Sequence, residues 1–202
     1  RLDIASAAGA DSFRREGYVA VTSGEPVASF TASVTEGDWP LTVQFTDTSF
    51  AGSSAITGWQ WDFGDGGTST AQHPMHAYAS KGTYTVSLTA TNAHGSSIET
   101  KTGYVTVYQP VDAGFNGAPT TGIAPLLVSF TNGSIGDYST LSWSFGDGGT
   151  SADASPAHTY SIPGVYTVTL TATGMGGTDT ETKVGYVTVY NPVVAGFEAT
   201  PT

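Results

Sequence analysis

The stretch Trp-Asp-Phe-Gly-Asp-Gly-Gly-Thr-Ser at residues 61–69 returns as Trp-Ser-Phe-Gly-Asp-Gly-Gly-Thr-Ser at residues 143–151. Large apolar side chains occupy alternate positions here: Trp59, Trp61 and Phe63 in the first copy, Leu141, Trp143 and Phe145 in the second. Side chains of a strand point to opposite faces every second residue, so this pattern predicts a half-buried strand. Gly-Asp-Gly-Gly then predicts a sharp turn, because glycine reaches positive φ and Asp bonds nearby backbone N–H groups.

The repeat extends over the whole chain. Proline segments at Pro26, Pro110 and Pro192 each precede similar residues, and proline fits a linker or an edge strand because it has no N–H to donate. They predict two complete units at residues 27–110 and 111–192. Residues 1–26 are interpreted as the last strands of a preceding partial unit, and residues 193–202 as the first strand of a following one. The chain is therefore expected to be a segment of a longer array.

Further alternating segments complete each unit. Apolar positions alternate at 41–45 and 126–130, and over longer segments at 84–91 and 166–173. A glycine-containing turn then precedes a last strand, predicted at 103–107 and from residue 185. No segment shows a convincing helical pattern. Six or seven short strands in about 82 residues are typical of a two-sheet sandwich, so the fold class expected is all-β.

Composition excludes several classes of function. The 202 residues include 6 Lys and Arg against 17 Asp and Glu, a formal net charge of −11 that repels nucleic acid. No apolar run approaches the roughly 20 residues that span a bilayer, so no membrane insertion is expected. There is no Cys, which excludes disulfides and thiolate metal sites. Cysteine avoidance in a Thr-rich, acidic chain favours an extracellular location.

The repeated motifs resemble those of PKD (polycystic kidney disease) domains. The residues that carry the resemblance are WDFGDGGTS, HAY and GTYTVSLTATN in the first unit, with WSFGDGG, HTY and GVYTVTLTAT in the second. Two departures are Ser144, where Asp is usual, and Gly174, where Asn is usual. The resemblance implies tandem immunoglobulin-like β-sandwiches, an extracellular setting and a role as a spacer, adhesive or interaction module without catalysis. Similar arrays occur in archaeal surface-layer proteins and secreted bacterial hydrolases.

Structural roles in the core and turns are predicted for eight residues: Trp61, Phe63, Asp65, Tyr84, Trp143, Phe145, Asp147 and Tyr166. Tyr84 and Tyr166 stand where immunoglobulin domains have a corner tyrosine. Val86 and Val168 follow two residues later, where those domains have a cysteine.

Asp62 and Asp65 suggest a glycosidase pair or part of a calcium site. Asp47, Thr48 and Ser49 could add ligands, but their counterparts in the second unit are Asn132, Gly133 and Ser134. Ser144 also replaces Asp62 there, so the carboxylate pair is not part of the shared design. Turn capping by Asp65 and Asp147 is the favoured interpretation. No cofactor or metal is predicted, with Ca²⁺ as the alternative.

His76 and His158 could form triads with Ser69 and Ser151, but no strained nucleophile turn accompanies them. Each His is instead expected to hydrogen-bond across the turn before its strand. Rows of Thr at 85–91 and 167–173 could form a ligand surface, although Thr is also an ordinary polar strand residue. Asn132-Gly133-Ser134 is a potential N-glycosylation acceptor.

The sequence predicts a non-catalytic extracellular structural or adhesive protein whose partners are neighbouring repeats, in the same chain or in identical chains that form a filament. The alternative is a polysaccharide- or protein-binding accessory module of a secreted hydrolase. A carbohydrate platform would need exposed coplanar aromatic rings. Alternation places Trp59 on the same face as buried Trp61, which leaves Trp39 beside Pro40 as the open candidate.

Overall fold

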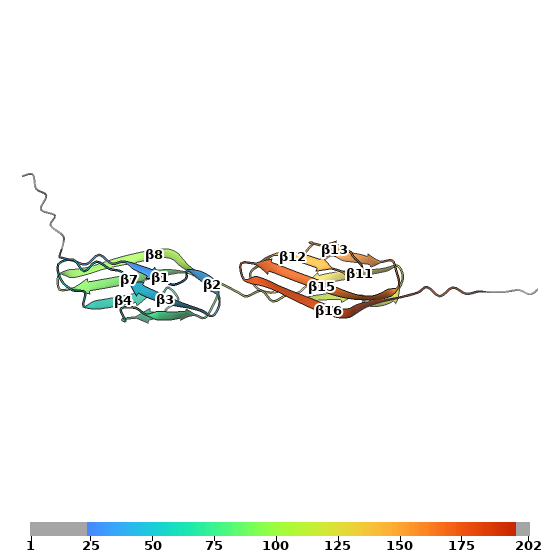
Figure 1. Cartoon of the computed structure of the whole chain (residues 1–202), viewed down its shortest axis with the longest axis horizontal. Helices are drawn as coiled ribbons and strands as arrows, with labels where there is room; N and C mark the ends of the chain where they lie inside the picture. The colour runs from blue at the N-terminus through green and yellow to red at the C-terminus, as the bar shows by residue number, and fades with distance from the viewer. Residues whose placement is uncertain (1–23, 197–202) are drawn as a thin grey trace, which may run out of the picture.

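The computed structural model describes residues 24–196, which form two β-sandwiches joined end to end (Figure 1). Of the predicted terminal partial units, residues 24–26 and 193–196 are described and form no strand, and the rest lies outside the described residues. Unit 1 contains β1 (Phe30–Ala32), β2 (Glu36–Asp38), β3 (Leu41–Asp47), β4 (Gly58–Asp62), β5 (Thr68–Ser69), β6 (Met75–Tyr78), β7 (Gly82–Asn92) and β8 (Gly95–Tyr108). The all-β prediction is confirmed: residues 24–196 contain no helix, and hence none long and apolar enough to cross a membrane.

Unit 2 repeats the same order of strands. It contains β9 (Phe115–Ala118), β10 (Thr121–Ile123), β11 (Leu126–Asn132), β12 (Tyr138–Ser144), β13 (Thr150–Ser151), β14 (Ala157–Tyr160), β15 (Gly164–Gly174) and β16 (Gly177–Tyr190).

Each unit consists of one three-stranded and one five-stranded sheet. The strand orders are β1-β3-β6 and β2-β8-β7-β4-β5 in unit 1, and β14-β11-β9 and β10-β16-β15-β12-β13 in unit 2. All pairs are antiparallel except β2 with β8 and β10 with β16. At these two short parallel strands, which the sequence did not predict, the chain leaves the three-stranded sheet, pairs with the edge of the five-stranded sheet and returns to the three-stranded sheet.

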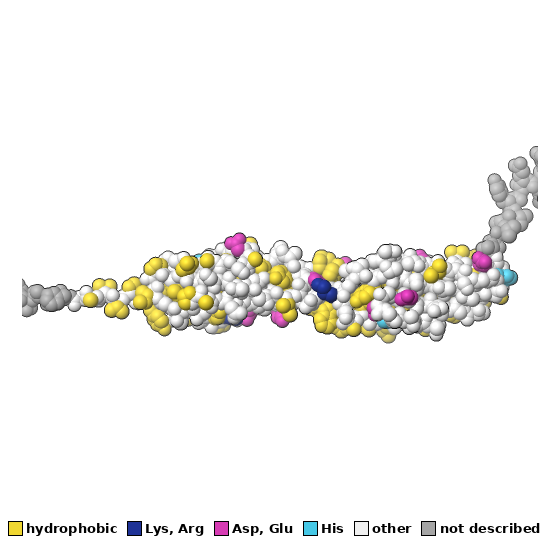
Figure 2. All heavy atoms as spheres, turned by 180° about the vertical axis from the view of Figure 1, so that it is seen from behind, with side chains coloured by type: hydrophobic (Ala, Val, Ile, Leu, Met, Phe, Trp, Pro, Cys, Tyr) yellow, Lys and Arg dark blue, Asp and Glu magenta, His cyan; other side chains and the backbone are white. Residues whose placement is uncertain are grey.

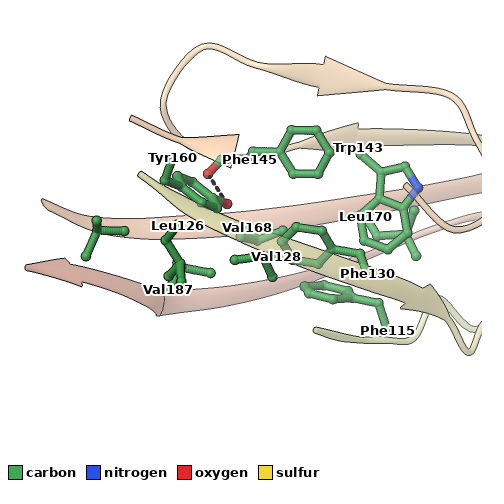
Figure 3. Packing of buried hydrophobic residues seen from close by; sticks show 11 residues of the cluster. Phe115, Leu126, Val128, Phe130, Trp143, Phe145, Tyr160, Val168, Leu170 and Val187 are labelled. Atoms are coloured by element: carbon green, nitrogen blue, oxygen red, sulfur yellow. Dashed lines mark hydrogen bonds between the residues drawn. The ribbon is translucent and has the colours of Figure 1, made fainter. Parts of the chain in front are cut away.

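The core of each unit lies between the two sheets and is centred on the tryptophan of the repeated motif. In unit 2, Trp143 packs against Phe115, Phe130 and Phe145, with ring centroids 5.3–6.4 Å apart (Figure 3). The Tyr160 hydroxyl donates to the carbonyl oxygen of Phe145 at 3.1 Å, which satisfies the polar end of this buried ring. Unit 1 repeats the arrangement around Trp61. Valine and leucine fill the space that a disulfide occupies in immunoglobulin domains.

The last strand of each unit is longer than predicted. β8 begins at Gly95 rather than Gly103, and the chain passes through Gly103 with φ of +59° at a register shift opposite Tyr84 and Val86. The apolar alternation starts only after this bulge. Between Gly95 and Gly103 the inward-facing positions carry polar side chains, like most of the outward-facing ones. The alternation of apolar and polar residues that predicts a half-buried strand is therefore absent there. The same correction applies to β16, which begins at Gly177.

The surface carries few charges for its area. Figure 2 shows acidic side chains scattered singly, and a basic side chain where the two units meet. Apolar side chains are frequent over unit 2 in this view.

Candidate functional site

The repeated Gly-Asp-Gly-Gly turn positions an Asp–His pair in each unit. His76 Nε2 lies 2.8 Å from Asp65 Oδ2, and the Gly67 N–H donates to Asp65 Oδ1 at 2.9 Å. The imidazole stacks on Phe63 with centroids 4.1 Å apart, so it also covers the edge of the core. Gly64 and Gly66 have φ of +82° and +91°, conformations that glycine adopts without strain.

Unit 2 reproduces this arrangement closely. His158 Nε2 lies 2.7 Å from Asp147 Oδ2, and the ring stacks on Phe145 at 4.2 Å. The structure therefore places both histidines across the turn from the capping aspartates.

Hydrogen bonding keeps these aspartates ionised. Partial burial alone would raise the pKa of Asp65, but the bonds from His76 and the Gly67 N–H outweigh it, so the pKa lies below its usual value. The same causes, from His158 and Gly149, lower the pKa of Asp147. Burial, followed by the charge of the nearby aspartate, raises the pKa of Tyr78 and of Tyr160 well above the ordinary phenol value.

The predicted calcium ligands are engaged by N–H donors. Asp47 Oδ2 accepts from the Trp59 indole at 2.7 Å and from Gln72, while Asp47 Oδ1 accepts from Ser49 N. Asp62 Oδ1 caps Gly64 N at 2.8 Å. Across residues 24–196, no group of three or more His, Asp or Glu side chains is arranged to hold a metal ion. In the structure these carboxylates accept hydrogen bonds from turn N–H groups, an amide and an indole.

The serines of the hypothetical triads have other partners. Ser69 Oγ accepts from the Ala71 N–H, and Ser151 Oγ bonds the Asp153 carboxylate and N–H. Asn132, the potential glycan acceptor, ends β11 and donates from its side-chain amide to Tyr138 Oη at 3.0 Å. Its glycosylation stays a prediction.

The corner tyrosines lie half-buried at the start of their strands. Tyr84 Oη donates to the Ser80 carbonyl at 2.8 Å, and Tyr166 Oη donates to the Ile162 carbonyl at 2.6 Å. These bonds back to the chain four residues upstream are typical of a tyrosine corner.

The sequence analysis missed a polar clasp formed by alternate residues of the last strand. In unit 1, Ser97 accepts from Ala28 N, Glu99 accepts from Phe30 N at 3.0 Å, and Lys101 Nζ donates to the Phe30 carbonyl. These side chains pair with the edge of β1 that β3 leaves free. Lys101 Nζ also lies 4.5 Å from the centre of the Phe30 ring, a cation–π contact.

Unit 2 has the same clasp. Asp179 accepts from Ala113 N, Glu181 accepts from Phe115 N at 2.8 Å, and Lys183 donates to the Phe115 carbonyl. The signal in the sequence is the identical Glu-Thr-Lys at 99–101 and 181–183. Charges that point inward at a sheet edge also discourage pairing with another chain.

A continuous array of hydroxyl groups covers the outer face of β12, β15 and β16. Register places nine Ser and Thr side chains in three rows: Ser144, Thr169 and Thr182; Ser142, Thr171 and Thr180; Thr140, Thr173 and Thr178. All nine are exposed or half-buried, and Thr171 and Thr180 lie 2.9 Å apart through their hydroxyls. The equivalent face of unit 1 is interrupted by Gly58, Gln60, Asp62 and Ile98. The hydroxyl array is therefore specific to unit 2.

The two units are joined by bonds that converge on Asp137. Lys81 of unit 1 forms an ion pair with Asp137 Oδ1 at 2.8 Å, and the linker residue Gln109 donates its N–H to Asp137 Oδ2 at 2.7 Å. The Asp137 N–H donates back to the Gln109 carbonyl at 3.0 Å. The hydrogen bonds from Lys81 and Gln109 hold the pKa of Asp137 below its usual value. A shallow groove beside this junction is lined by Thr83, Tyr108, Tyr138 and Met175 among others.

Comparison with known proteins places these features in a family. A collagenase of Vibrio alginolyticus is 40% identical over 76 residues, which are 37% of this chain and 9% of that protein. Collagenase ColA of Bacillus cereus is 41% identical over 68 residues, 33% of this chain and 7% of that protein. The chain thus spans less than a tenth of either relative.

Two solved structures are similar to this chain. The PKD1 domain of the Vibrio cholerae metalloprotease PrtV is 38% identical, with 41% of this chain and 96% of that chain covered and a TM-score of 0.37. The amphioxus IgVJ-C2 molecule has a TM-score of 0.51 at 15% identity, over 75% of this chain and 99% of that one. This second likeness shows only the two-domain immunoglobulin-like fold. The PKD domain family matches residues 23–107 and 110–189, and the chain belongs to this family as a tandem of two such domains.

Proposed function

We propose that this chain is a non-catalytic accessory segment of a secreted hydrolase, which holds a catalytic domain close to an insoluble protein substrate. The observation that carries the proposal is the similarity of single units to parts of two collagenases and a metalloprotease. The geometry supports it, because the polar side chains of the Asp–His turns are used to hold the fold. An extracellular location is part of the proposal and agrees with the absence of Cys.

The hydroxyl array of unit 2 is the surface that we propose contacts the substrate. It is uncharged in a strongly acidic protein, and each hydroxyl can both donate and accept, as binding to backbone amides of a protein polymer requires. A polysaccharide is less well supported, because exposed aromatic residues in the described part lie apart. Trp39 follows β2, Phe50 follows β3, and Tyr190 ends β16.

Co-sedimentation with insoluble collagen fibres, and with chitin as the carbohydrate comparison, tests this function. We expect the chain to be depleted from solution by collagen and not by chitin. Replacing Thr140, Thr171 and Thr180 by Val should lower retention at least several-fold, because Val has the shape of Thr without its hydroxyl. The same three positions changed to Ser keep the hydroxyls and should retain binding. Equal retention of all three proteins, or none on collagen, would remove the support for this surface.

A structural rod on the cell surface is the second candidate, favoured by the bonded junction around Asp137. Electron microscopy of the native material distinguishes the two functions. Filaments with an axial repeat of one or two sandwich lengths would favour the rod, and dispersed particles would favour the accessory segment.

A further inference from the structure

A groove of about 340 Å³ lies in unit 2 between β12 and the loop that follows β13. Leu141 of β12 lines it and is only partly buried against the core. Ala152 and Ala154 of the loop are exposed and contribute methyl groups. Tyr138 and Asn132 add a hydroxyl and an amide to the lining. None of the side chains that line the groove is charged.

In unit 1 the Trp59 indole fills the corresponding place. Trp59 packs against the core and donates from its ring N–H to Asp47 at 2.7 Å, and Gln72 bonds the same carboxylate oxygen at 3.2 Å. Unit 2 has smaller side chains at the positions that fill and flank this place: Leu141 for Trp59, Ala154 for Gln72 and Ala152 for Thr70. A large ring in unit 1 therefore corresponds to a groove in unit 2.

Strand pairing fixes these counterparts independently of counting along the chain. Trp59 is paired with Ala90 of β7, and Leu141 is paired with Ala172 at the same step of β15. The indole of the buried tryptophan also holds the following loop in the same way in both units: Trp61 Nε1 donates to the Ala71 carbonyl at 2.8 Å, and Trp143 Nε1 donates to the Asp153 carbonyl at 2.9 Å. The replaced glutamine is the next residue of that loop.

The polar end of the groove differs from that of unit 1. Asn132 and Asp47 are counterparts, because each is paired with the phenylalanine that begins the first strand of its unit. Asn132 Nδ2 donates to Tyr138 Oη at 3.0 Å, and Tyr138 keeps its own O–H as a donor. The groove thus combines apolar walls, an aromatic ring and a small number of polar groups, which is typical of a ligand site.

We propose that this groove binds a planar aromatic side chain of a protein ligand, which takes the place that the Trp59 indole fills in unit 1. An aromatic ring entering it meets the methyl groups of the loop and the ring of Tyr138, and aromatic rings pack favourably against one another. Thr140 lines the groove and also belongs to the hydroxyl array, so a ligand can contact both. The inference goes beyond the proposed function and is independent of whether the array binds collagen.

Carbon–proton NMR of the whole chain, titrated with N-acetyltryptophanamide, tests the proposal. The methyl signals of Leu141, Ala152 and Ala154 should shift and reach saturation. The signals of Trp59 in unit 1 should stay unchanged, because the indole already fills that place. N-acetylglucosamine is the carbohydrate comparison and should cause no saturable shift.

Filling the groove with the side chains of unit 1, Leu141→Trp together with Ala154→Gln, should abolish the saturable shifts. Ala154→Gln alone changes an exposed position outside the core, so the variant should keep its melting temperature and bind at least several-fold more weakly. Leu127→Thr is the matched control: it removes an exposed apolar side chain elsewhere in unit 2, where unit 1 has Thr42, and should bind like the original chain.

These variants leave the hydroxyl array unchanged, so retention on collagen reports separately on the proposed function. The absence of saturable shifts in the original chain overturns the proposed ring site. So does undiminished binding by Ala154→Gln, or an equal response around Trp59. Saturable shifts with N-acetylglucosamine and none with the aromatic probe would assign the groove to a sugar and overturn the proposal as well.

Discussion

At the scale of single residues, each unit is stabilised by tyrosine hydroxyl groups that each donate a hydrogen bond to one backbone carbonyl. The Tyr160 hydroxyl is fully buried and bonds the Phe145 carbonyl, while the Tyr166 hydroxyl bonds the Ile162 carbonyl nearer the surface. Removing a partner costs most where water cannot replace it.

Tyr160→Phe should therefore lower the free energy of unfolding of unit 2 by about 1–3 kcal/mol, because a buried carbonyl loses its donor. Tyr166→Phe should cost less, about 0.5–1.5 kcal/mol, since its bond is exposed. Urea unfolding followed by NMR signals of unit 2, which are resolved from those of unit 1, measures both. An equal effect of the two substitutions would contradict the difference in burial.

Asp147→Asn tests the Asp–His turn through the pH dependence of stability. The folded pKa of Asp147 lies below its ordinary value of 3.8, so the carboxylate stabilises unit 2 fully above that pH. This contribution is lost as pH falls through the lower folded pKa. The stability difference between the original chain and the variant should be constant from pH 7 to about 5 and shrink below 3.8. A difference that is the same at every pH would show that the turn does not depend on the ionised carboxylate.

At the scale of strands, the polar clasp completes a sandwich whose first strand is paired on one edge only. Glu181 accepts a hydrogen bond from the N–H of Phe115, and Lys183 donates one to its carbonyl, although both lie far from Phe115 in the sequence. These side chains satisfy the backbone groups on the free edge of β9, as a neighbouring strand does elsewhere in the sheet.

Lys183→Met keeps most of the side-chain packing and removes the donor, so we expect a loss of about 2 kcal/mol in unit 2, since bonds to charged groups are stronger than average. Amide hydrogen exchange at Gly117 and Asn116 in β9 should accelerate, while β1 in unit 1 keeps its protection. Lys183→Arg retains a charged donor and serves as the control. Unchanged exchange in β9 would mean that the clasp contributes nothing to holding this strand.

At the scale of the whole molecule, the ion pair of Lys81 with Asp137 and the bonds of Gln109 fix how one unit follows the next. Lys81 is largely exposed, so its pair is expected to govern orientation more than stability.

Lys81→Met should broaden the distribution of distances between the units without changing the melting temperature. The chain has no Cys, so cysteines placed at the exposed positions Thr70 and Ala154 carry spin labels at unique sites. Double electron–electron resonance should show the broader distribution for Lys81→Met, a smaller change at high salt, and none for Lys81→Arg. Identical distributions in all cases would assign the orientation to the linker bonds alone.

The sequence alone predicted the tandem repeat, the family, the sandwich class and the strand that carries Trp61 or Trp143. These follow from the spacing of apolar residues and from turn residues, which act over a few neighbours. Strand boundaries failed where no apolar alternation existed, as in β8 before Gly103 and in the three-residue strands β2 and β10.

Only the tertiary structure decided which distant polar groups meet. The clasp joins residues about 70 positions apart, and Asp137 meets a lysine 56 positions earlier in another unit. The alternation of residues along the chain predicts on which face of a strand a side chain lies. Which distant group that side chain contacts depends on how the sheets and the units pack together.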